Sequence, residues 1–529
     1  SLFNRINAMS RASMVGNVAA GIPTDCPTAE KRGYLGDASF AAPGTLWNYG
    51  YESVYRSFLT VIADSQTASG EVPTSVPCPH PHCPLQGCRG TGPSDNWTFP
   101  AVWGPAHCND IAWTSGFPII AELNYRFTGD TRTAERHWPS LYHYTEHLVA
   151  RAGAYPGNVT ACDPGNDRQV LDNVVALGDW VMPTQCTGQP AGSRCEVKLE
   201  VSGMSYILTL RSMASLANAI GHHAVGDRYA ALADNASASF HKVHWNSAFE
   251  SYGGDSGVTQ TLTVPALVVD APPTAALATK AAAALQHDLA TRTNHHLSTG
   301  AVMSKWLLET LSENGLHSSA IKVATQTTFP SWGWWLAMNA TTCWETWHNG
   351  TGHTTGIGPF LGSSNSHNHV MLCGGISSWF WTQLAGLKPT SPAFATISIA
   401  PRIHPELGPA SVSANYSSPR GPISIEWHRH NTSAFSLTAD IPVGVESALV
   451  SVPTPLDATE VREGGVTMWA RTETGLAGPD NLDHLAAAAH GLEWVATESD
   501  AISFRAGSGR YQFEAANSNS VTTDDSQDP

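Results

Sequence analysis

The chain has 529 residues, which is long enough for two or three domains with a large core. Its 28 Lys and Arg residues stand against 44 Asp and Glu residues, and the resulting net charge of −16 argues against nucleic acid or an anionic membrane as a partner. No run of about eighteen apolar residues is present, so we expect no transmembrane helix. Because the chain starts with Ser1 and lacks an apolar signal core, we expect a mature or trimmed product.

Helical periodicity dominates the first part of the chain. Residues 2–20 predict a first helix from apolar residues at Leu2, Ile6, Met9, Met14 and Val18. A second helix is predicted by a single apolar face that contains Trp47, Tyr51, Val54, Tyr55, Phe58 and Ile62. Further helices are expected near residues 111–127, 133–152, 203–222, 227–243, 274–292, 301–313, 316–326 and 372–385.

Between the first two helices lies an acidic segment, Gly21–Asp37. Three carboxylates, Asp25, Glu30 and Asp37, fall within it, and Pro and Gly residues interrupt the run, which predicts a loop. Carboxylates crowded on a loop suit the binding of sugar hydroxyls and general acid catalysis, because crowding raises a carboxyl pKa. A solvated acidic turn is the alternative.

Residues 68–109 are rich in Pro, Gly and Cys and predict a long irregular insertion. The chain has ten cysteines, an even number that permits disulfides, and Cys186 and Cys195 bracket a short segment that would form a stapled loop. The run from Cys78 to Cys83, with Cys88 following, also resembles a zinc site. Its prolines hinder the wrapping of ligands around one ion, so we favour a disulfide-stapled insertion.

The N-glycosylation pattern recurs along the chain. The acceptor asparagines are Asn96, Asn158, Asn235, Asn339, Asn349, Asn415 and Asn431. Together with the even number of cysteines, they favour a secreted eukaryotic glycoprotein.

The helical pattern ends near residue 387, and no alternation of strands and helices of the kind a parallel sheet needs precedes that point. About ten helices in pairs favour a toroid of concentric helices over a four-helix bundle. From residue 388 to 516, apolar residues alternate, as in Ile423, Ile425 and Trp427, which predicts an antiparallel β-sandwich. Residues 517–529 are polar and acidic, and we expect them to be disordered. The domains are therefore 1–387, with the insertion at 68–109, and 388–516.

A second set of candidate site residues lies near the end of the helical part. Glu345 is flanked by Trp344 and Trp347, and aromatic walls raise a carboxyl pKa and bind the apolar face of a sugar. A core aromatic cluster with one exposed glutamate is the alternative. His367 and His369 follow on a loop, and a metal site there would need a third ligand that the sequence does not assign.

Several of these motifs, in this order, resemble those of glycoside hydrolase family 78, the α-L-rhamnosidase family. The resemblance runs from about residue 2 to 387 and continues more weakly into the β-sandwich. It rests on Asp25-Cys-Pro-Thr-Ala-Glu30-Lys-Arg-Gly-Tyr-Leu-Gly-Asp37, Gly178-Asp-Trp180, Thr327-Thr-Phe-Pro-Ser-Trp332-Gly, Ala340-Thr-Thr-Cys-Trp-Glu345 and Ser366-His-Asn-His369.

The resemblance implies an (α/α)6 barrel with a C-terminal β-sandwich, and an inverting hydrolysis. With the glycosylation pattern, our leading hypothesis is a secreted exo-acting enzyme that releases terminal α-L-rhamnose. It assigns Glu30 as the general acid and Glu345 as the general base. The substrate-binding residues that we expect are Asp25, Tyr34, Asp37, Asp110, Trp180, Trp332, Trp344 and His369, of which Asp110 is the looser match. We expect no metal and no cofactor in this chemistry.

Two positions depart from the family pattern. Ala29 stands where the family usually has Arg, and Tyr34 stands where it usually has Trp. The missing Arg removes a charge-assisted donor that contributes roughly 1.5–3 kcal/mol. These departures leave two alternatives open: an inverting glycosidase for another sugar, and a non-catalytic extracellular glycoprotein, structural or sugar-binding, built on the same fold.

The expected partner is a rhamnose-containing carbohydrate or glycoside, with no nucleic acid and no membrane. The family normally carries β-domains before the first helix. We expect that these domains were lost, were removed by proteolysis, or reside on another polypeptide with which this chain associates. Self-assembly of the chain is the further possibility.

Overall fold

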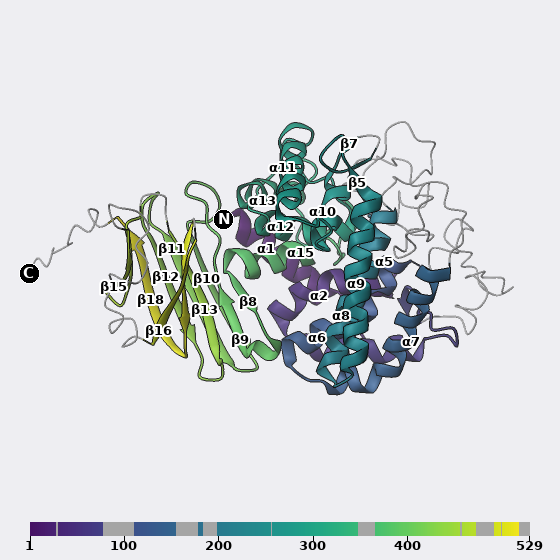
Figure 1. The fold of residues 1–529 in the computed structure, drawn as a ribbon. Coiled ribbons are helices and arrows are strands. Elements are labelled where there is room, and N and C mark those ends of the chain that lie inside the picture. The colour runs from purple at the N-terminus through teal and green to yellow at the C-terminus, as the bar shows by residue number, and fades with distance from the viewer. Residues whose placement is uncertain are drawn as a thin grey trace, which may run out of the picture. The chain divides into compact units, whose positions relative to one another are not determined.

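The computed structural model describes residues 1–27, 30–77, 110–154, 178–183, 198–254, 257–347, 366–454, 458–471, 491–498 and 500–517 (Figure 1). Contacts divide the chain into two units. The first comprises residues 1–125 and 130–378, and the second comprises residues 126–129 and 379–529. The predicted insertion at 68–109 and the predicted disordered tail at 517–529 fall mostly outside the described residues.

The first unit is built almost entirely of helices. The described helices are α1 (Leu2–Gly16), α2 (Leu35–Tyr49), α3 (Glu52–Asp64), α5 (Ile111–Thr114), α6 (Gly116–Thr128), α7 (Arg132–Ala154), α8 (Lys198–Ala219), α9 (His223–His244), α10 (Gln260–Val268), α11 (Ala275–Thr291), α12 (Ala301–Glu313), α13 (His317–Ala324), α14 (Trp332–Ala337) and α15 (Gly374–Trp379). Consecutive helices pack on each other, as α8 does with α9 and α12 with α13.

Short two-residue strands accompany these helices near the N-terminus. β1 (Val18–Ala19) pairs with β2 (Ile22–Pro23), and β3 (Gly33–Tyr34) pairs with β4 (Ser75–Val76). A second small sheet contains β5 (Trp245–Asn246), β6 (Ser251–Gly254) and β7 (Gly257–Val258). The β3–β4 pair matters for the site because it fixes the end of the acidic segment.

Three sequence predictions need correction in this unit. The helix predicted around residues 47–62 is two helices, because Gly50 adopts a left-handed conformation (φ 60°) and its N–H caps α2 on the carbonyl of Leu46. Asp37 lies in the first turn of α2 rather than on a loop. The first helix ends at Gly16, and Val18 belongs to β1. We did not predict α10 and α14, or the first part of α2.

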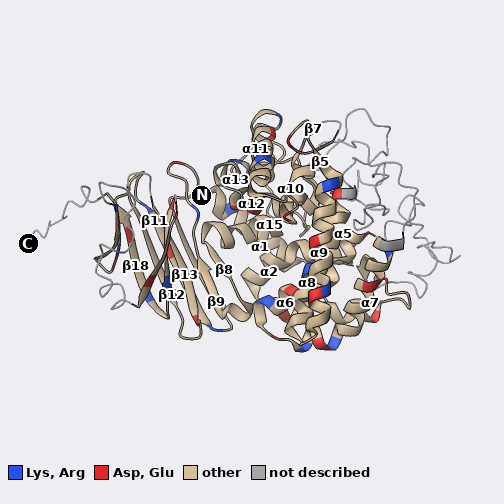
Figure 2. Ribbon diagram, viewed as in Figure 1, with Lys and Arg blue, Asp and Glu red and all other residues tan. Residues whose placement is uncertain are grey.

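Helix α2 is unusual in its charge. Its sequence contains one Asp, Glu, Lys or Arg residue, Asp37, and twelve of its residues are buried. Figure 2 shows the contrast with α7 and α9, on which blue and red residues alternate along the ribbon. A carboxylate in an otherwise uncharged, buried helix is costly unless it is paired, so the partners of Asp37 matter for this helix.

The second unit is a β-sandwich of two sheets. It starts with a π-helical turn (Phe380–Leu384), followed by a short 3-10 helix at Pro392–Phe394. The strands are β8 (Leu387–Pro389), β9 (Thr396–Ile399), β10 (Ser411–Ser418), β11 (Gly421–Arg429), β12 (Phe435–Ile441), β13 (Ser447–Pro453), β14 (Glu460–Glu463), β15 (Val466–Ala470), β16 (Leu492–Thr497), β17 (Ala501–Ala506) and β18 (Gly509–Ala516).

One sheet has the order β10-β11-β12-β18-β14-β15 and the other β16-β17-β13-β9-β8. The pairs are antiparallel except β13 with β9. The predicted alternation of Ile423, Ile425 and Trp427 places all three side chains in the core. Rings of Phe504 and Phe513 stack there at 5.6 Å, one from each sheet. Leu449 is 37 % exposed, because β13 turns its neighbours Ala448 and Val450 inward instead.

Candidate active site

The acidic segment is held together by its own hydrogen bonds. The backbone N–H of Asp25 donates to the carbonyl of Arg32 (2.9 Å), and the N–H of Arg32 donates back to Asp25 Oδ1 (2.7 Å). The thiol of Cys26 donates to Asp25 Oδ2 (3.0 Å) and accepts the N–H of Glu30 (3.3 Å). Lys31 completes the return in a left-handed conformation (φ 58°), which is strained for a side chain other than glycine. Asp25 therefore organises the segment that presents Glu30.

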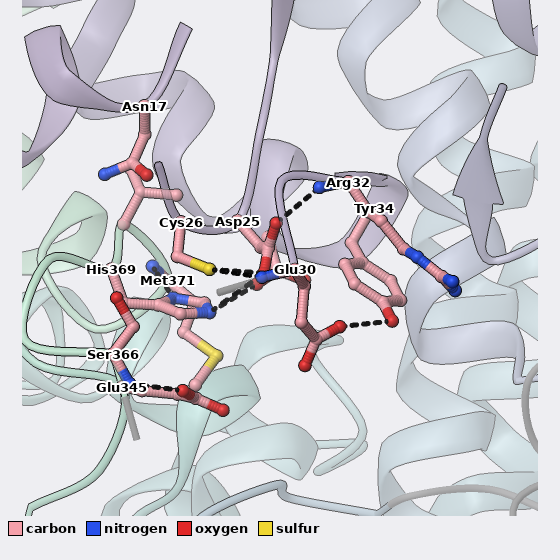
Figure 3. A network of polar contacts seen from close by, with 12 residues as sticks. Asn17, Asp25, Cys26, Glu30, Arg32, Tyr34, Glu345, Ser366, His369 and Met371 are labelled. Atoms are coloured by element: carbon pink, nitrogen blue, oxygen red, sulfur yellow. Dashed lines mark hydrogen bonds and ion pairs between the residues drawn. The ribbon is translucent and has the colours of Figure 1, made fainter. Parts of the chain in front are cut away.

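Glu30 is exposed, in contrast to the carboxylates on either side of it. Its Oε2 accepts a hydrogen bond of 2.7 Å from the hydroxyl of Tyr34 (Figure 3). Tyr34 belongs to β3, so the β3–β4 pairing holds the ring that contacts Glu30. This contact gives the predicted substrate-binding residue Tyr34 a partner within the site.

Asp37 is buried at the start of α2. Its Oδ2 accepts a hydrogen bond from Trp113 Nε1 (3.0 Å). Trp113 approaches this closely because residue 36 is glycine: a Cβ there would lie 2.6 Å from the indole ring. Burial, assisted by the charge of Asp25, raises the pKa of Asp37 well above its usual value.

Asp110 lies three residues before Trp113. It is fully buried and caps α5 by accepting the N–H of Ala112 (2.9 Å). The substrate contact of Asp110 stays a prediction.

His369 lies between the two aspartates. Its Nε2 is 3.5 Å from Asp37 Oδ1 and 4.0 Å from Asp25 Oδ2. Burial lowers the pKa of His369 to about 3, so the ring is neutral at ordinary pH. Because Nδ1 accepts the N–H of Met371 (3.4 Å), the single ring proton belongs on Nε2, facing the carboxylates. Burial also raises the pKa of Asp25 to about 6.

Glu345 reaches the same site from a segment more than 300 residues away. Its backbone N–H donates to the carbonyl of Ser366 (2.9 Å), and its Oε2 accepts the N–H of Ser366 (2.8 Å). Next to this pair, the N–H of His369 donates to the carbonyl of Cys343 (2.8 Å). These hydrogen bonds join the segment that contains Glu345 to the segment that contains His369.

Burial raises the pKa of Glu345 to about 7, and the negative charges of Glu30 and Asp25 add to the shift. Those charge effects require the three carboxylates to be near neighbours. Figure 3 shows the carboxylates of Glu30 and Glu345 turned toward the same space. Glu30 is exposed and hydrogen-bonded, whereas Glu345 is only 7 % exposed. The two groups therefore sit in unlike surroundings.

The three tryptophans predicted to bind substrate differ in their surroundings. Trp332 is fully buried, and its indole N–H donates to the carbonyl of Leu372 (2.9 Å). Trp344 is 6 % exposed and stacks on His367 at 4.5 Å. Trp180 is half-buried, and its carbonyl accepts the N–H of Ala301 (2.7 Å). Trp180 is therefore the most solvent-exposed of the three, whereas Trp332 and Trp344 are buried by packing against neighbouring residues.

Sequence reasoning missed the structural role of Asp179 in Gly178-Asp-Trp180. Its carboxylate accepts the N–H groups of Gly300 (2.7 Å) and Met303 (3.0 Å), so it caps α12 from a distant segment. Gly300 permits the approach, since a Cβ there would lie 2.2 Å from the carbonyl of Trp180. No local pattern marks a cap that is 121 residues away in sequence. Trp113 was missed for the same reason, because its partner Asp37 is 76 residues away.

Only three of the ten cysteines lie within the described residues. Cys26, Cys343 and Cys373 are buried free thiols. The remaining seven of the ten, including Cys186 and Cys195 and the run at 78–88, lie outside the described residues. An even number of cysteines therefore does not mean that all of them pair.

The described part of the chain contains no group of three or more His, Cys, Asp or Glu side chains that could hold a metal ion. Nor does any helix in that part have the length and apolar character needed to cross a membrane. Of the predicted glycan acceptors, Asn235, Asn339, Asn415 and Asn431 are exposed. Asn96, Asn158 and Asn349 lie outside the described residues. So does Ala29, one of the two positions that depart from the family pattern.

Comparison with known families decides the relationship. Residues 1–384 match the model of the bacterial alpha-L-rhamnosidase 6 hairpin glycosidase domain, and residues 386–467 match that of the bacterial alpha-L-rhamnosidase C-terminal domain. The chain belongs to this rhamnosidase family. The membership confirms the resemblance and the fold prediction of a helical (α/α)6-type domain followed by an antiparallel β-sandwich.

Individual relatives agree with this assignment. A curated alpha-L-rhamnosidase of Formosa agariphila is 25 % identical over 434 residues, which are 82 % of this rhamnosidase-family chain and 41 % of the relative. The chain thus spans less than half the length of that relative. The alpha-L-rhamnosidase structure from Dictyoglumus thermophilum matches with a TM-score of 0.76 at 24 % identity, over 98 % of this chain and 49 % of its own. The Streptomyces avermitilis alpha-L-rhamnosidase complexed with L-rhamnose has a TM-score of 0.71 at 22 % identity, over 97 % of this chain and 41 % of its own.

Proposed function

We propose that this chain carries the catalytic machinery of an exo-acting glycoside hydrolase that releases terminal α-L-rhamnose with inversion. The observation that carries the proposal is the pair Glu30 and Glu345, which come from distant segments and turn toward one space. Asp25, Asp37 and His369 lie beside them. The names of the relatives support rhamnose as the sugar.

Glu30 acts as the general acid in this mechanism. Its exposed carboxyl gives a proton to the glycosidic oxygen while the bond from that oxygen to the anomeric carbon breaks. The aglycone leaves as a neutral alcohol or phenol, and Glu30 becomes a carboxylate. An exposed position at the rim of a loop suits this role, because the aglycone must be able to leave.

Glu345 acts as the general base. It takes a proton from a water molecule, whose oxygen attacks the anomeric carbon on the face opposite the leaving group. An inverting pair stands about 6.5–9.5 Å apart to leave room for that water. The Ser366 N–H on Oε2 fixes one carboxylate oxygen and leaves Oε1 for the water. Solvent then returns both carboxyl groups to their starting states.

Asp25, Asp37 and neutral His369 hold the sugar. Carboxylate oxygens accept hydrogen bonds from sugar hydroxyls, and neutral His369 lies within 4.0 Å of both aspartates without adding a positive charge. The indole N–H of Trp113 donates to Asp37 Oδ2 and so fixes the orientation of this carboxyl group. Burial of these groups makes each hydrogen bond to the sugar stronger than it would be in water.

The test is turnover of an aryl α-L-rhamnoside by the chain and by single variants. We expect phenol release by the wild type, and a loss of about 100-fold or more with Glu30→Gln on a poor leaving group. Glu345→Ala should be inactive in buffer and recover with azide, which attacks without a base and yields the inverted glycosyl azide. A panel of other aryl glycosides separates rhamnose from another sugar. No turnover of any member between pH 3 and 8 would overturn the proposal and favour a non-catalytic glycoprotein.

We also propose that the protein is secreted, N-glycosylated and disulfide-stapled through Cys186 and Cys195. The seven acceptor patterns support this, as does the exposure of the four acceptor asparagines within the described residues. Protein isolated from its natural source should lose mass on treatment with a peptide N-glycosidase. Peptide mapping without reduction should find the Cys186–Cys195 bridge. An unchanged mass and two free thiols would contradict this proposal.

A further inference from the structure

One contact in the site is not accounted for by the acid and base roles alone. The Tyr34 hydroxyl donates to Oε2 of Glu30 at 2.7 Å, a well-formed O–H···O hydrogen bond. The neighbouring carboxylates have other donors: Asp37 has the Trp113 N–H, and Glu345 has the Ser366 N–H. Tyr34 is thus the donor for Glu30 (Figure 3).

The backbone holds Tyr34 firmly. Its N–H donates to the carbonyl of Arg32 (3.0 Å), and the N–H of the next residue, Leu35, donates to the carbonyl of Thr74 (2.8 Å). On the other side, Gly33 packs so closely that a Cβ there would lie 2.4 Å from the carbonyl of Val76. The ring therefore comes from a fixed strand and can direct its hydroxyl at one carboxylate oxygen.

The phenol stays a donor over the whole working range of pH. Burial raises the pKa of Tyr34 well above its usual value, and the charge of Glu30 adds to this. Tyr34 is only half-buried. Even so, the negative charge of a neighbouring carboxylate opposes ionisation of the phenol. A neutral hydroxyl beside Glu30 can donate whether or not Glu30 carries a proton.

We propose that Tyr34 is a positioning residue that makes Glu30 a better proton donor as the glycosidic bond breaks. This inference rests on the proposed function. Because Oε2 accepts from Tyr34, the proton destined for the leaving group sits on Oε1. When that proton moves to the glycosidic oxygen, Glu30 becomes a carboxylate and its hydrogen bond from Tyr34 becomes charge-assisted and stronger. Tyr34 thus stabilises the product form of the acid.

The first test compares leaving groups in Tyr34→Phe. Hydrolysis of methyl α-L-rhamnoside, which needs full protonation, should fall about 10- to 100-fold, the range expected for losing a hydrogen bond to a charged group. Hydrolysis of 2,4-dinitrophenyl α-L-rhamnoside, whose leaving group needs little protonation, should fall less than about threefold. Tyr49→Phe is the matched control, since it also loses a hydroxyl hydrogen bond, to Arg11, but lies at the far end of α2. Equal losses on both substrates would overturn the proposal.

The second test uses the pH profile. Without the Tyr34 hydroxyl, the carboxylate form of Glu30 is less stable, so the limb of the profile that Glu30 sets should move up by about one pH unit in Tyr34→Phe. Incorporating 3-fluorotyrosine at position 34, a stronger donor, should move the same limb down. A limb that stays in place, or that moves the same way in both variants, would contradict the role assigned to Tyr34.

A third measurement does not depend on turnover. In protein labelled with carboxyl-¹³C glutamate, the Glu30 signal is identified by its absence in Glu30→Gln. The pH at which that signal titrates should be higher in Tyr34→Phe than in the wild type, and unchanged in Tyr49→Phe. If the wild type hydrolyses no rhamnoside but this shift is present, the proposed function fails while the contact stands. If turnover is present but the shift is absent, the Tyr34 inference fails alone.

Discussion

At the scale of single residues, the site works by giving like groups unlike surroundings. Glu345 is buried against a backbone segment and its pKa is about 7, whereas Glu30 is exposed and hydrogen-bonded to Tyr34. His369 is buried as a neutral ring between two aspartates. In the proposed mechanism, environment rather than residue type separates the roles of base, acid and sugar holder.

The proposed base should set one limb of the activity profile. In the proposed mechanism Glu345 works only when deprotonated, and burial raises its pKa to about 7. We therefore expect the kcat/KM profile on an aryl α-L-rhamnoside to have a limb centred near pH 7. The measurement is a pH–rate profile of the wild type under conditions where substrate is far below KM. A profile with no limb near pH 7 would contradict the assignment of Glu345 as the buried base.

Individual side chains show where sequence reasoning reaches its limit. The pattern of the acidic segment singled out Asp25, Glu30 and Asp37 as candidates, because ionisable groups in a Pro- and Gly-rich segment are visible in sequence. It could not distinguish an indole that lines a cavity from one in the core. Trp332 is fully buried, and that depends on contacts with residues such as Leu372 that lie far along the chain.

At the scale of elements, long amphipathic helices were predictable and short ones were not. The predicted helix at 301–313 matches α12, because its apolar face repeats over several turns. Helix α10 has nine residues with Pro265 inside it, and α14 has six, so neither presents a clear period. Tertiary contacts hold such short helices in place. In the β-sandwich, strands with clean alternation were found, whereas β14 and β15 lie in segments of mixed polarity.

The start of α12 should depend on Asp179. Replacing Asp179 with Ala leaves the N–H groups of Gly300 and Met303 buried without acceptors, which should lower the free energy of unfolding by about 2–4 kcal/mol. Asp179→Asn keeps one acceptor and should lose less. Urea unfolding, followed by tryptophan fluorescence, measures both.

Thr274→Ala is the control for this experiment. Thr274 caps α11 by accepting the N–H of Leu277 (3.3 Å) at an exposed position, where water can replace the lost bond. We expect a loss of about 0.5–1 kcal/mol. Equal effects of the Asp179 and Thr274 replacements would show that the distant cap adds nothing beyond a local one.

At the scale of the whole molecule, pH acts on stability in opposite directions. A group whose pKa is raised by folding stabilises the folded chain below its ordinary pKa, and this contribution is lost as the pH rises through the folded value. Glu345, Asp25 and Asp179 are of this kind, with pKa values of about 7, 6 and 7. His369 is the reverse: its pKa is lowered to about 3, so stability is lost as the pH falls below the usual histidine value. The free energy of unfolding of the wild type therefore contains both contributions at every pH. The difference in this free energy between a variant and the wild type isolates the contribution of one group.

Replacing Glu345 with Gln should isolate one of these contributions. Between pH 4.5 and 7 the folded chain holds a proton on Glu345 that the unfolded chain has released. The free energy of unfolding of Glu345→Gln, relative to wild type, should therefore rise by about 3 kcal/mol from pH 4.5 to pH 8. Urea unfolding of both proteins at several pH values measures this. Glu514→Gln, at an exposed position of β18, is the control, and a constant difference for Glu345→Gln would contradict a buried, desolvated base.

In the proposed mechanism, Glu30 and Glu345 act across one space as an inverting acid and base. The most direct measurement is ¹H NMR of an aryl α-L-rhamnoside in D₂O immediately after the enzyme is added. The first sugar signal should be that of β-L-rhamnose, with the α-anomer appearing later at the rate of spontaneous mutarotation. If α-L-rhamnose appears first, the two glutamates do not act as an inverting pair, and the roles assigned to them are wrong.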